Sequence, residues 1–205
     1  MSGWKDGIRN AYRYATWPWR HAYLNRMARA QTVPIAIVFY HRVADEHPNP
    51  WTITSSVFQQ QIDWLQAHYD LISLDEVQRR ITSGNARPAA SITFDGGYAD
   101  NCNRAIPLLI ERGIPVTYFV TTHHTVHNKP FPHDVSRQLP LPSNSIESLR
   151  ALVNAGVEIG SHTRSHLNLA GCTDTVTLFN ELIAATLEME SMIDRPIRYF
   201  AFPFG

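Results

Sequence analysis

The 205-residue sequence predicts an α/β fold in which parallel strands alternate with helices, as an open sheet or as a barrel. Two observations lead to this prediction. Short apolar runs that contain β-branched residues, such as Ile35 to Tyr40, are typical of buried strands. Between these runs lie longer segments with the apolar spacing of helices. The hydrophobic content of 44% is enough for a substantial core, and the sequence contains no internal repeat or low-complexity segment.

The composition excludes several classes of protein. The 18 basic and 18 acidic side chains balance, so no overall positive charge attracts nucleic acid. Cys102 and Cys172 lie in no CxxC pattern, which leaves a zinc cluster or a disulfide framework unsupported and favours free thiols. The ten histidines stand out, because imidazole binds metals and transfers protons near neutral pH.

Residues 1–32 form a separate basic segment with a net charge of +5, against −5 for the rest of the chain. Apolar and aromatic residues recur here at helical spacing, so we expect an amphipathic helix, or two helices broken near Pro18. The helix either packs against the main domain, which is the commoner arrangement and our expectation, or binds a membrane surface or a partner. The segment has no apolar core of a secretory signal, and no later stretch is apolar enough to span a membrane. The basic residues are Lys5, Arg9, Arg13, Arg20, Arg26 and Arg29, and the apolar positions are Trp4, Ile8, Ala11, Tyr12, Ala15, Trp19, Ala22, Tyr23 and Met27.

From residue 33 to residue 205, strands and helices alternate. A strand from Ile35 to Tyr40 is followed by a polar, proline-rich loop. Ser55 or Ser56 can cap the next helix, and a shorter helix from Asp75 ends before Gly84. After this first unit, strands and helices continue to alternate, and the last predicted element is a strand. The predicted elements are a strand Ser91 to Phe94, a helix Asn101 to Arg112 closed by Gly113, a strand Pro115 to Val120, a helix that starts with a capping box of Asn144 and Glu147 and ends at Gly156, a strand Val157 to Ile159, a helix from about Asp174 to Met192, and a strand Tyr199 to Phe202.

Three loops that leave strand ends carry unusual residues. The carboxyl ends of parallel strands are where functional side chains gather in such folds. One loop carries Asp95, the next carries His162 and His166 four residues apart, and the third is a rigid turn over 202–205. A histidine pair with this spacing and a carboxylate from another strand commonly hold a catalytic divalent metal with an open position for water. The two histidines share one face if their loop turns helically.

These motifs resemble a known family. Thr93 to Tyr98, Gly160 to His166 and Phe200 to Gly205 look like the first three motifs of the polysaccharide deacetylases, the NodB-homology carbohydrate esterases of family 4. Tyr40-His41-Arg42 resembles an opening seen in many members, and the likeness covers about 170 residues from Ile35 onwards. The resemblance implies a distorted (β/α)7 TIM-like barrel. It also implies metal-dependent removal of N-acetyl groups from amino-sugar polymers such as chitin, peptidoglycan or poly-N-acetylglucosamine.

Carried over by position, the resemblance assigns six residues. Asp95 corresponds to the general base, and His162 and His166 to the two histidines that bind a divalent metal, most often zinc. Phe204 corresponds to an aromatic residue whose main-chain N–H helps to bind the oxyanion. His41 and Tyr98 are expected to contact the N-acetylated glycan substrate.

The sequence departs from the family pattern at two places. The family's third metal ligand is a second aspartate, which is Gly96 here, so the predicted metal site is incomplete and the activity impaired. The chain also stops at Gly205, where family members continue, so we expect a barrel that lacks its last strands, as a fragment, an exchanged oligomer or a barrel closed by residues 1–32. Two alternatives stay open, which are an inactive carbohydrate-binding relative and a membrane-surface scaffold that acts through residues 1–32. The compartment also stays open between cytoplasmic, membrane-peripheral and cell-envelope locations.

Four further histidines follow the strand that ends at Val120. We expect His123, His124, His127 and His133 to lie in a polar surface loop, because proline-rich loops rarely hold ligands in fixed geometry. The alternative is that they line the barrel mouth or form a second metal site.

Overall fold

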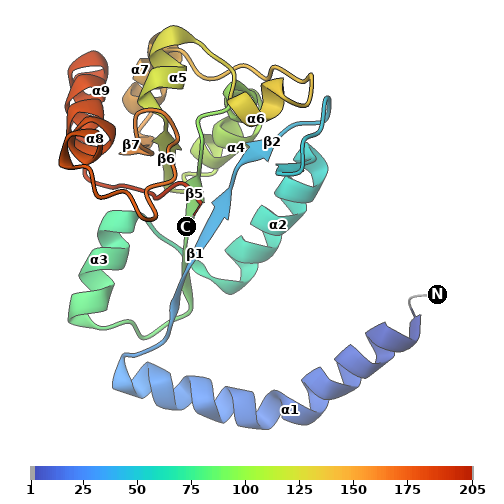
Figure 1. The fold of residues 1–205 in the computed structure, drawn as a ribbon. Helices are drawn as coiled ribbons and strands as arrows, with labels where there is room; N and C mark the ends of the chain where they lie inside the picture. The colour runs from blue at the N-terminus through green and yellow to red at the C-terminus, as the bar shows by residue number, and fades with distance from the viewer. Residues whose placement is uncertain (1–2, 205) are drawn as a thin grey trace.

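The computed structural model describes residues 3–204 (Figure 1). Its main sheet has five parallel strands, in the order β1-β5-β6-β7, and β4 pairs with the start of β5 beside them. The register aligns Ile35 with Ala89, Ile92 with Val116, and Thr117 with Glu158. The strands are β1 (Ile35–Tyr40), β4 (Asp70–Leu71), β5 (Ala89–Phe94), β6 (Val116–Val120) and β7 (Glu158–Ser161), and a separate pair consists of β2 (Arg42–Val43) and β3 (Thr52–Ile53).

The central strands confirm the expectation of burial on both faces, whereas β1 does not. Every residue of β5 and of β6 is buried. In β1, Ile37 is 54% exposed and Phe39 is 60% exposed, although Tyr40 is buried. The reason is position, because β1 is an edge strand paired only with β5, and nothing in the described part of the chain covers the face that carries Ile37 and Phe39.

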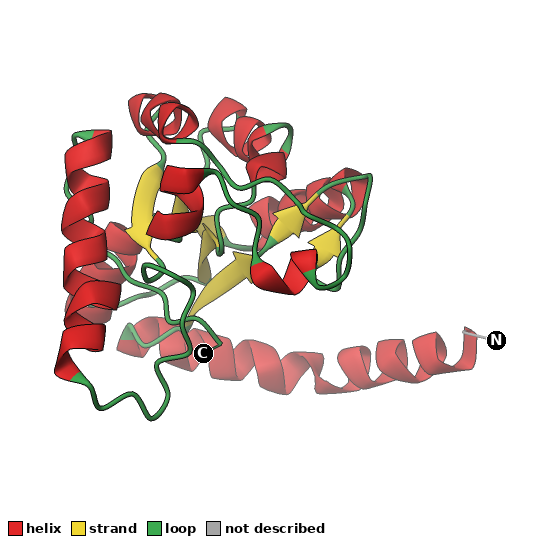
Figure 2. Cartoon of the chain, turned by 45° about the horizontal axis from the view of Figure 1, so that its top comes forward, coloured by secondary structure: helices red, strands yellow, loops and turns green. Residues whose placement is uncertain are grey.

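Helices cover the sheet and pack with its strands to form the core (Figure 2). Phe58, Ile62, Leu109, Leu149 and Met189 from α2, α4, α7 and α9 pack in one cluster with side chains of β5 and β6. A smaller cluster joins the start of α3 to β5 and β6. The helices are α2 (Ser55–His68), α3 (Leu74–Ser83), α4 (Ala105–Glu111), α5 (Thr122–His127), α6 (Pro132–Val135), α7 (Ile146–Asn154), α8 (Thr175–Leu178) and α9 (Ala185–Ile193), with a 3-10 helix at Ala99–Cys102 and a π-helix at Phe179–Ala184.

Two helix starts differ from the sequence prediction by one residue. Thr54 caps α2 by accepting a hydrogen bond from the main-chain N–H of Val57, so neither Ser55 nor Ser56 is the cap. Ser145 rather than Asn144 caps α7. In both cases the residue before the helix has the extended backbone that a capping side chain needs, and the next residue is already helical.

The helix predicted for Asn101 to Arg112 is divided into the 3-10 helix and α4. Pro107 explains the division, because proline lacks a main-chain N–H and is unfavourable beyond the first turn of a helix. A helix that began at Asn101 would place Pro107 in its interior. By beginning at Ala105, α4 keeps Pro107 in its first turn.

The strand predicted for Tyr199 to Phe202 is reduced to a single parallel bridge between Ser161 and Phe200. The main-chain N–H of Ser161 donates to Tyr199 O at 2.9 Å, and that of Ala201 donates to Ser161 O at 3.0 Å. This segment therefore lies beside β7 and extends the sheet in the direction away from β1. The α/β class is confirmed, and closure into a seven-stranded barrel stays a prediction because the described residues form an open sheet.

The N-terminal segment is one helix, α1 (Gly3–Ala30), with Pro18 inside it, so of the two expected arrangements the single helix is the one observed. The expected packing of its aromatic stripe against the main domain is wrong, because the stripe's large side chains Trp4, Ile8, Tyr12, Trp19 and Tyr23 are all exposed. The helix runs out from the domain (Figures 1 and 2) and joins it at residues 31–33, which bond to Asn85. No helix in residues 3–204 is both long and apolar enough to cross a membrane.

Candidate active site

A cavity of about 500 Å³ opens where β1, β5 and β7 end. Its volume is within the usual range of small-ligand sites. The structure brings together in its wall all six site residues predicted from the sequence, which are His41, Asp95, Tyr98, His162, His166 and Phe204, and Gly96 lies among them.

Asp95 is the first residue after β5, and the end of the strand fixes its position. Its main-chain N–H donates to Tyr40 O at 2.8 Å, which ties it to the end of β1. The Oδ1 atom is buried and has no hydrogen-bond partner among the described residues. Burial raises the pKa of the Asp95 carboxyl to about 6. A buried carboxylate oxygen without a partner is costly, and such groups are found where a site uses them.

Gly96 and Gly97 turn the chain sharply behind Asp95, with φ values of 98° and 95°. The nearest atoms to a Cβ added at Gly96 would be those of Tyr98 and Phe131, at 3.6 to 3.8 Å, which is ordinary contact distance. Space for a Cβ atom therefore exists at Gly96, but the backbone has a conformation that residues other than glycine rarely adopt.

His162 follows β7 and is buried. Its Nδ1 lies 2.9 Å from Ala201 O, and since a carbonyl oxygen only accepts, Nδ1 carries the hydrogen and Nε2 keeps its lone pair. Burial lowers the pKa of His162 to about 4, with a smaller contribution from His41. The ring is therefore neutral at pH 7, which is the form that binds a metal.

His166 lies beside His162, with 5.0 Å between the ring centroids. Burial and then the neighbouring His162 lower the pKa of His166 to about 3. The loop does not turn helically, because Thr163 and His166 have φ values of 66° and 62°. The two rings still converge, because the His166 N–H donates to Thr163 Oγ1 at 3.0 Å and closes a tight turn.

Glu181 anchors this histidine loop, and the sequence analysis missed it. Its buried carboxylate accepts hydrogen bonds from the main-chain N–H of Arg164 at 3.0 Å, from that of Ser165 at 2.9 Å, and from Ser165 Oγ at 2.7 Å. Glu181 lies in the π-helix, a form that often marks functional positions. Nothing in the apolar spacing of this helix distinguishes Glu181 from its exposed neighbours, so no sequence signal was available.

Asn101 holds the loop that carries His41. Its Oδ1 accepts from the Val43 N–H at 2.9 Å, and its Nδ2 donates to His41 O at 2.8 Å. Asn101 is completely buried, so both bonds are shielded from water. A polar residue shortly after the Asp95 motif is the sequence signal that could have identified it.

The hydroxyl of Tyr98 is already engaged within the protein. It donates to Asp134 Oδ2 at 2.7 Å and lies 3.0 Å from His133 Nε2, and Tyr98 is almost fully buried. Of the predicted substrate contacts, Tyr98 therefore offers its ring rather than its hydroxyl. The expectation of a surface loop is wrong for His123, His124 and His127, which lie in α5, although His127 is exposed. It is also wrong for His133, which lines the cavity.

Aromatic rings make up much of the remaining cavity wall, and most of them were not predicted. Trp51 stands 5.0 Å from His133 between ring centroids, and Phe204 stands 5.1 Å from His166. Aromatic rings offer large, rigid apolar surfaces on which the C–H faces of sugars pack. The other rings in the wall are Phe39, Phe131 and Phe202.

The described residues do not complete a three-ligand metal site. His162 and His166 offer two neutral imidazoles, and Gly96 offers no donor. Within residues 3–204, no three histidine, cysteine, aspartate or glutamate side chains are grouped so that they could hold a metal ion. A catalytic zinc usually has three protein ligands, so this donor set is one short.

Comparisons with known proteins agree with the geometry. A Bacillus subtilis (strain 168) protein named "Putative polysaccharide deacetylase YxkH" is 24% identical over 174 residues, which are 83% of this chain and 57% of that protein. The chain thus spans little more than half of that curated relative. Among solved structures, IcaB from Ammonifex degensii aligns with a TM-score of 0.67 and 22% identity, over 83% of this chain and 74% of that one. The Streptococcus pyogenes deacetylase PplD in complex with acetate aligns with a TM-score of 0.68 and 20% identity, over 84% and 75%.

These structural likenesses establish the fold. The family is established by sequence, since the pattern of the family described as polysaccharide deacetylase matches residues 82–205, more than half of the chain. That match contains Asp95, His162, His166 and Phe204. The chain belongs to the polysaccharide deacetylase family.

Proposed function

We propose that the cavity binds an N-acetylated amino sugar within a polysaccharide, and that the chain hydrolyses the acetamide slowly because its metal site is one ligand short. The observation that carries this proposal is the convergence of Asp95, His162 and His166 in one aromatic-walled cavity. His162 and His166 are the proposed ligands of a divalent ion, with zinc the first choice. Without a donor at Gly96, that ion is held weakly.

Acetamide hydrolysis needs a base and a stabilised oxyanion. Water adds to the acetyl carbon, the C–N bond then breaks, and acetate and a free amine leave. In the proposal, the carboxylate of Asp95 accepts the proton of the attacking water, because its pKa of about 6 leaves it mostly ionised at neutral pH, and passes that proton to the amine nitrogen as the C–N bond breaks. The main-chain N–H of Phe204, beside His166, is the proposed donor to the developing oxyanion.

A second candidate function is glycan binding without hydrolysis. The observation that favours it is the lack of a three-ligand group within residues 3–204. Both candidate functions need the same sugar-binding cavity, and they differ only in whether the bound acetamide is hydrolysed.

Calorimetric titration with a soluble N-acetylglucosamine oligomer tests the shared part of the proposal. We expect binding, weaker binding of the de-N-acetylated oligomer, and a loss of at least about tenfold in affinity for Trp51→Ala, because Trp51 lines the cavity. Trp64→Ala is the matched control, because Trp64 is similarly exposed (48% against 41%) but lies on α2 outside the cavity.

Equal affinity of the Trp51→Ala variant and the unaltered protein would overturn the proposed sugar site. Acetate release with added zinc then separates the two candidates. Release that depends on Asp95 supports the hydrolase, and tight binding without release supports the glycan-binding protein.

A further inference from the structure

We propose that α1 binds the surface of an anionic lipid bilayer and lies flat on it, through an apolar stripe made of Trp4, Ile8, Tyr12, Trp19 and Tyr23. This function is separate from the sugar site and does not depend on it.

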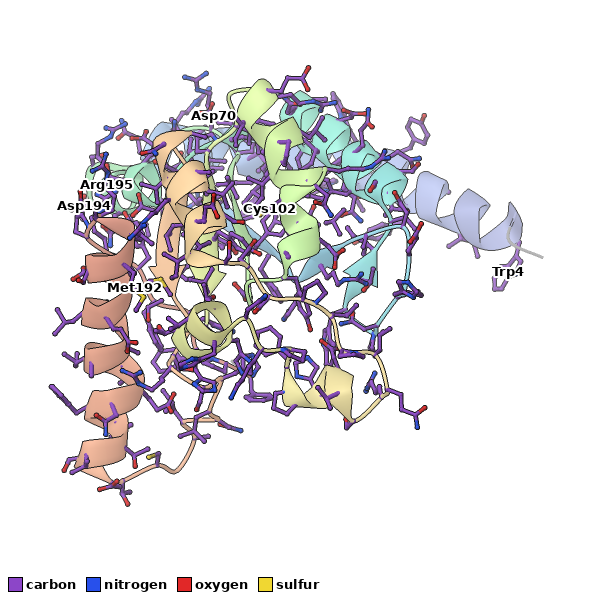
Figure 3. All side chains as sticks on the ribbon, turned by 90° about the horizontal axis from the view of Figure 1, so that it is seen from above. Trp4, Asp70, Cys102, Met192, Asp194 and Arg195 are labelled. Carbon is purple, nitrogen blue, oxygen red and sulfur yellow. The ribbon has the colours of Figure 1, made fainter. Side chains whose placement is uncertain are left out.

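The stripe is continuous and has no partner within the described chain. At 3.6 residues per turn, its five residues fall within about a third of the helix circumference. Their exposed fractions run from 59% for Ile8 to 81% for Trp19. Figure 3 shows Trp4 at the end of α1 that is far from the domain. Large apolar side chains gain free energy when they leave water, so this face favours an apolar partner.

The charge of the segment identifies the kind of partner. Residues 1–32 hold six lysines and arginines against one aspartate, a net charge of +5 in a chain whose total is zero. Arg20, Arg26 and Arg29 are exposed on the helix. A basic helix with an aromatic face matches an anionic bilayer, where basic side chains meet lipid phosphates and tryptophan and tyrosine rings enter the headgroup layer.

The composition of α1 favours lying on the bilayer over crossing it. The helix has 28 residues, which is long enough to span, but no window of it is apolar enough to do so. A helix that carries an apolar stripe and exposed arginines, but is not apolar enough to span, instead lies in the interface plane.

The position of α1 suits this role. The helix joins the domain just before the start of β1, whereas the sugar cavity opens beyond the other end of β1 (Figure 1). A bilayer that holds α1 therefore leaves the cavity mouth free to face water and a polysaccharide.

Vesicle co-sedimentation of the full chain tests the proposal. We expect binding to vesicles of phosphatidylcholine with phosphatidylglycerol, at least about tenfold weaker binding to phosphatidylcholine alone, and weakening by salt. The double variant Tyr12→Ala/Trp19→Ala should bind anionic vesicles at least about tenfold more weakly than the unaltered chain.

The matched control is Tyr14→Ala/Trp17→Ala. It also removes one exposed tyrosine and one exposed tryptophan from α1, but from outside the stripe, so we expect less than about a twofold loss. Circular dichroism of both variants confirms that the helix is retained. Equal losses in the two variants would overturn the proposal, as would equal binding to neutral and anionic vesicles. A dimer that α1 holds together and that does not bind vesicles would instead assign the stripe to a second copy of the chain.

Discussion

His162 Nδ1 donates a hydrogen bond of 2.9 Å to the carbonyl oxygen of Ala201. This bond joins two of the three motif loops, because Ala201 lies in the last loop and His162 follows β7. It also fixes the tautomer, so that Nε2 is the atom left to bind a ligand. The third motif thus orients a cavity histidine in addition to supplying Phe204.

The two ring nitrogens of His162 therefore have different roles, and substitutions that remove one or both of them are expected to have different effects. In the variant His162→Asn, the side-chain amide can still donate to Ala201 O, but nothing replaces Nε2. We expect zinc affinity, measured by calorimetry, to fall at least about tenfold. We expect the free energy of unfolding in urea to change by less than about 1 kcal/mol, because the buried hydrogen bond is kept.

His162→Ala is the control, because it removes both nitrogens. We expect it to lower both zinc affinity and the free energy of unfolding, the latter by about 1–3 kcal/mol, because Ala201 O loses its donor. Unchanged zinc affinity in both variants would show that His162 is not a ligand.

The buried carboxyl of Asp95 predicts a pH-dependent effect on stability. Folding raises its pKa from 3.8 to about 6, so the folded chain keeps a proton that the unfolded chain releases. Below the pKa that Asp95 has in the unfolded chain, its burial therefore does not lower the free energy of unfolding. As the pH rises from that value towards 6, the free energy of unfolding falls. Asp95→Asn avoids this penalty, so we expect it to be more stable than the unaltered protein at neutral pH, by at most about 3 kcal/mol.

Urea unfolding with a metal chelator present measures this difference. We expect the gap between Asp95→Asn and the unaltered protein to widen between about pH 4 and about pH 7. A gap that stays constant over this range would mean that the Asp95 carboxyl is not buried as described. The same substitution should abolish acetate release, because an amide cannot accept the proton.

Glu181 is predicted to hold the histidine loop. In Glu181→Gln, the side-chain NH2 group faces main-chain N–H and hydroxyl donors whose hydrogen bonds the carboxylate accepted. We expect the free energy of unfolding to fall by about 1–3 kcal/mol. Glu188→Gln is the matched control, because Glu188 bonds Arg164 from the same helical region at 2.6 Å but is partly exposed. Its loss should stay below about 1 kcal/mol. Equal losses of unfolding free energy in the two variants would contradict the role of Glu181 in holding the histidine loop.

The features that were best predicted from the sequence are those that short-range patterns determine. The central strands β5 and β6 appear as apolar runs, and α3 ends before Gly84 as expected. Strand-end positions and the resemblance to the family's motifs together indicated the site residues. Asp95 and His162 line one cavity although 67 positions separate them in the chain, because parallel strands deliver their carboxyl ends to one edge of the sheet.

What the sequence could not predict depends on contacts between distant segments. Glu181 resembles an ordinary polar residue until the loop that it bonds is placed beside it. The hydroxyl of Tyr98 donates a hydrogen bond to Asp134, 36 positions away, and no local sequence pattern indicates that bond. The stripe of α1 was read correctly as a helix face, but whether such a face packs or stays exposed depends on the rest of the surface.

The zinc affinity of Gly96→Asp, compared with that of Gly96→Asn by calorimetry, tests the central claim most directly. Both substitutions place a side chain of similar shape where φ is 98° and where a Cβ meets only ordinary contacts, so they share the same backbone strain. Only aspartate adds the missing anionic ligand. We predict that Gly96→Asp binds zinc at least about tenfold more tightly than both the unaltered protein and Gly96→Asn, with acetate release rising in parallel. Equal zinc affinity in all three proteins would contradict the account, because Gly96 would then not be the missing ligand position.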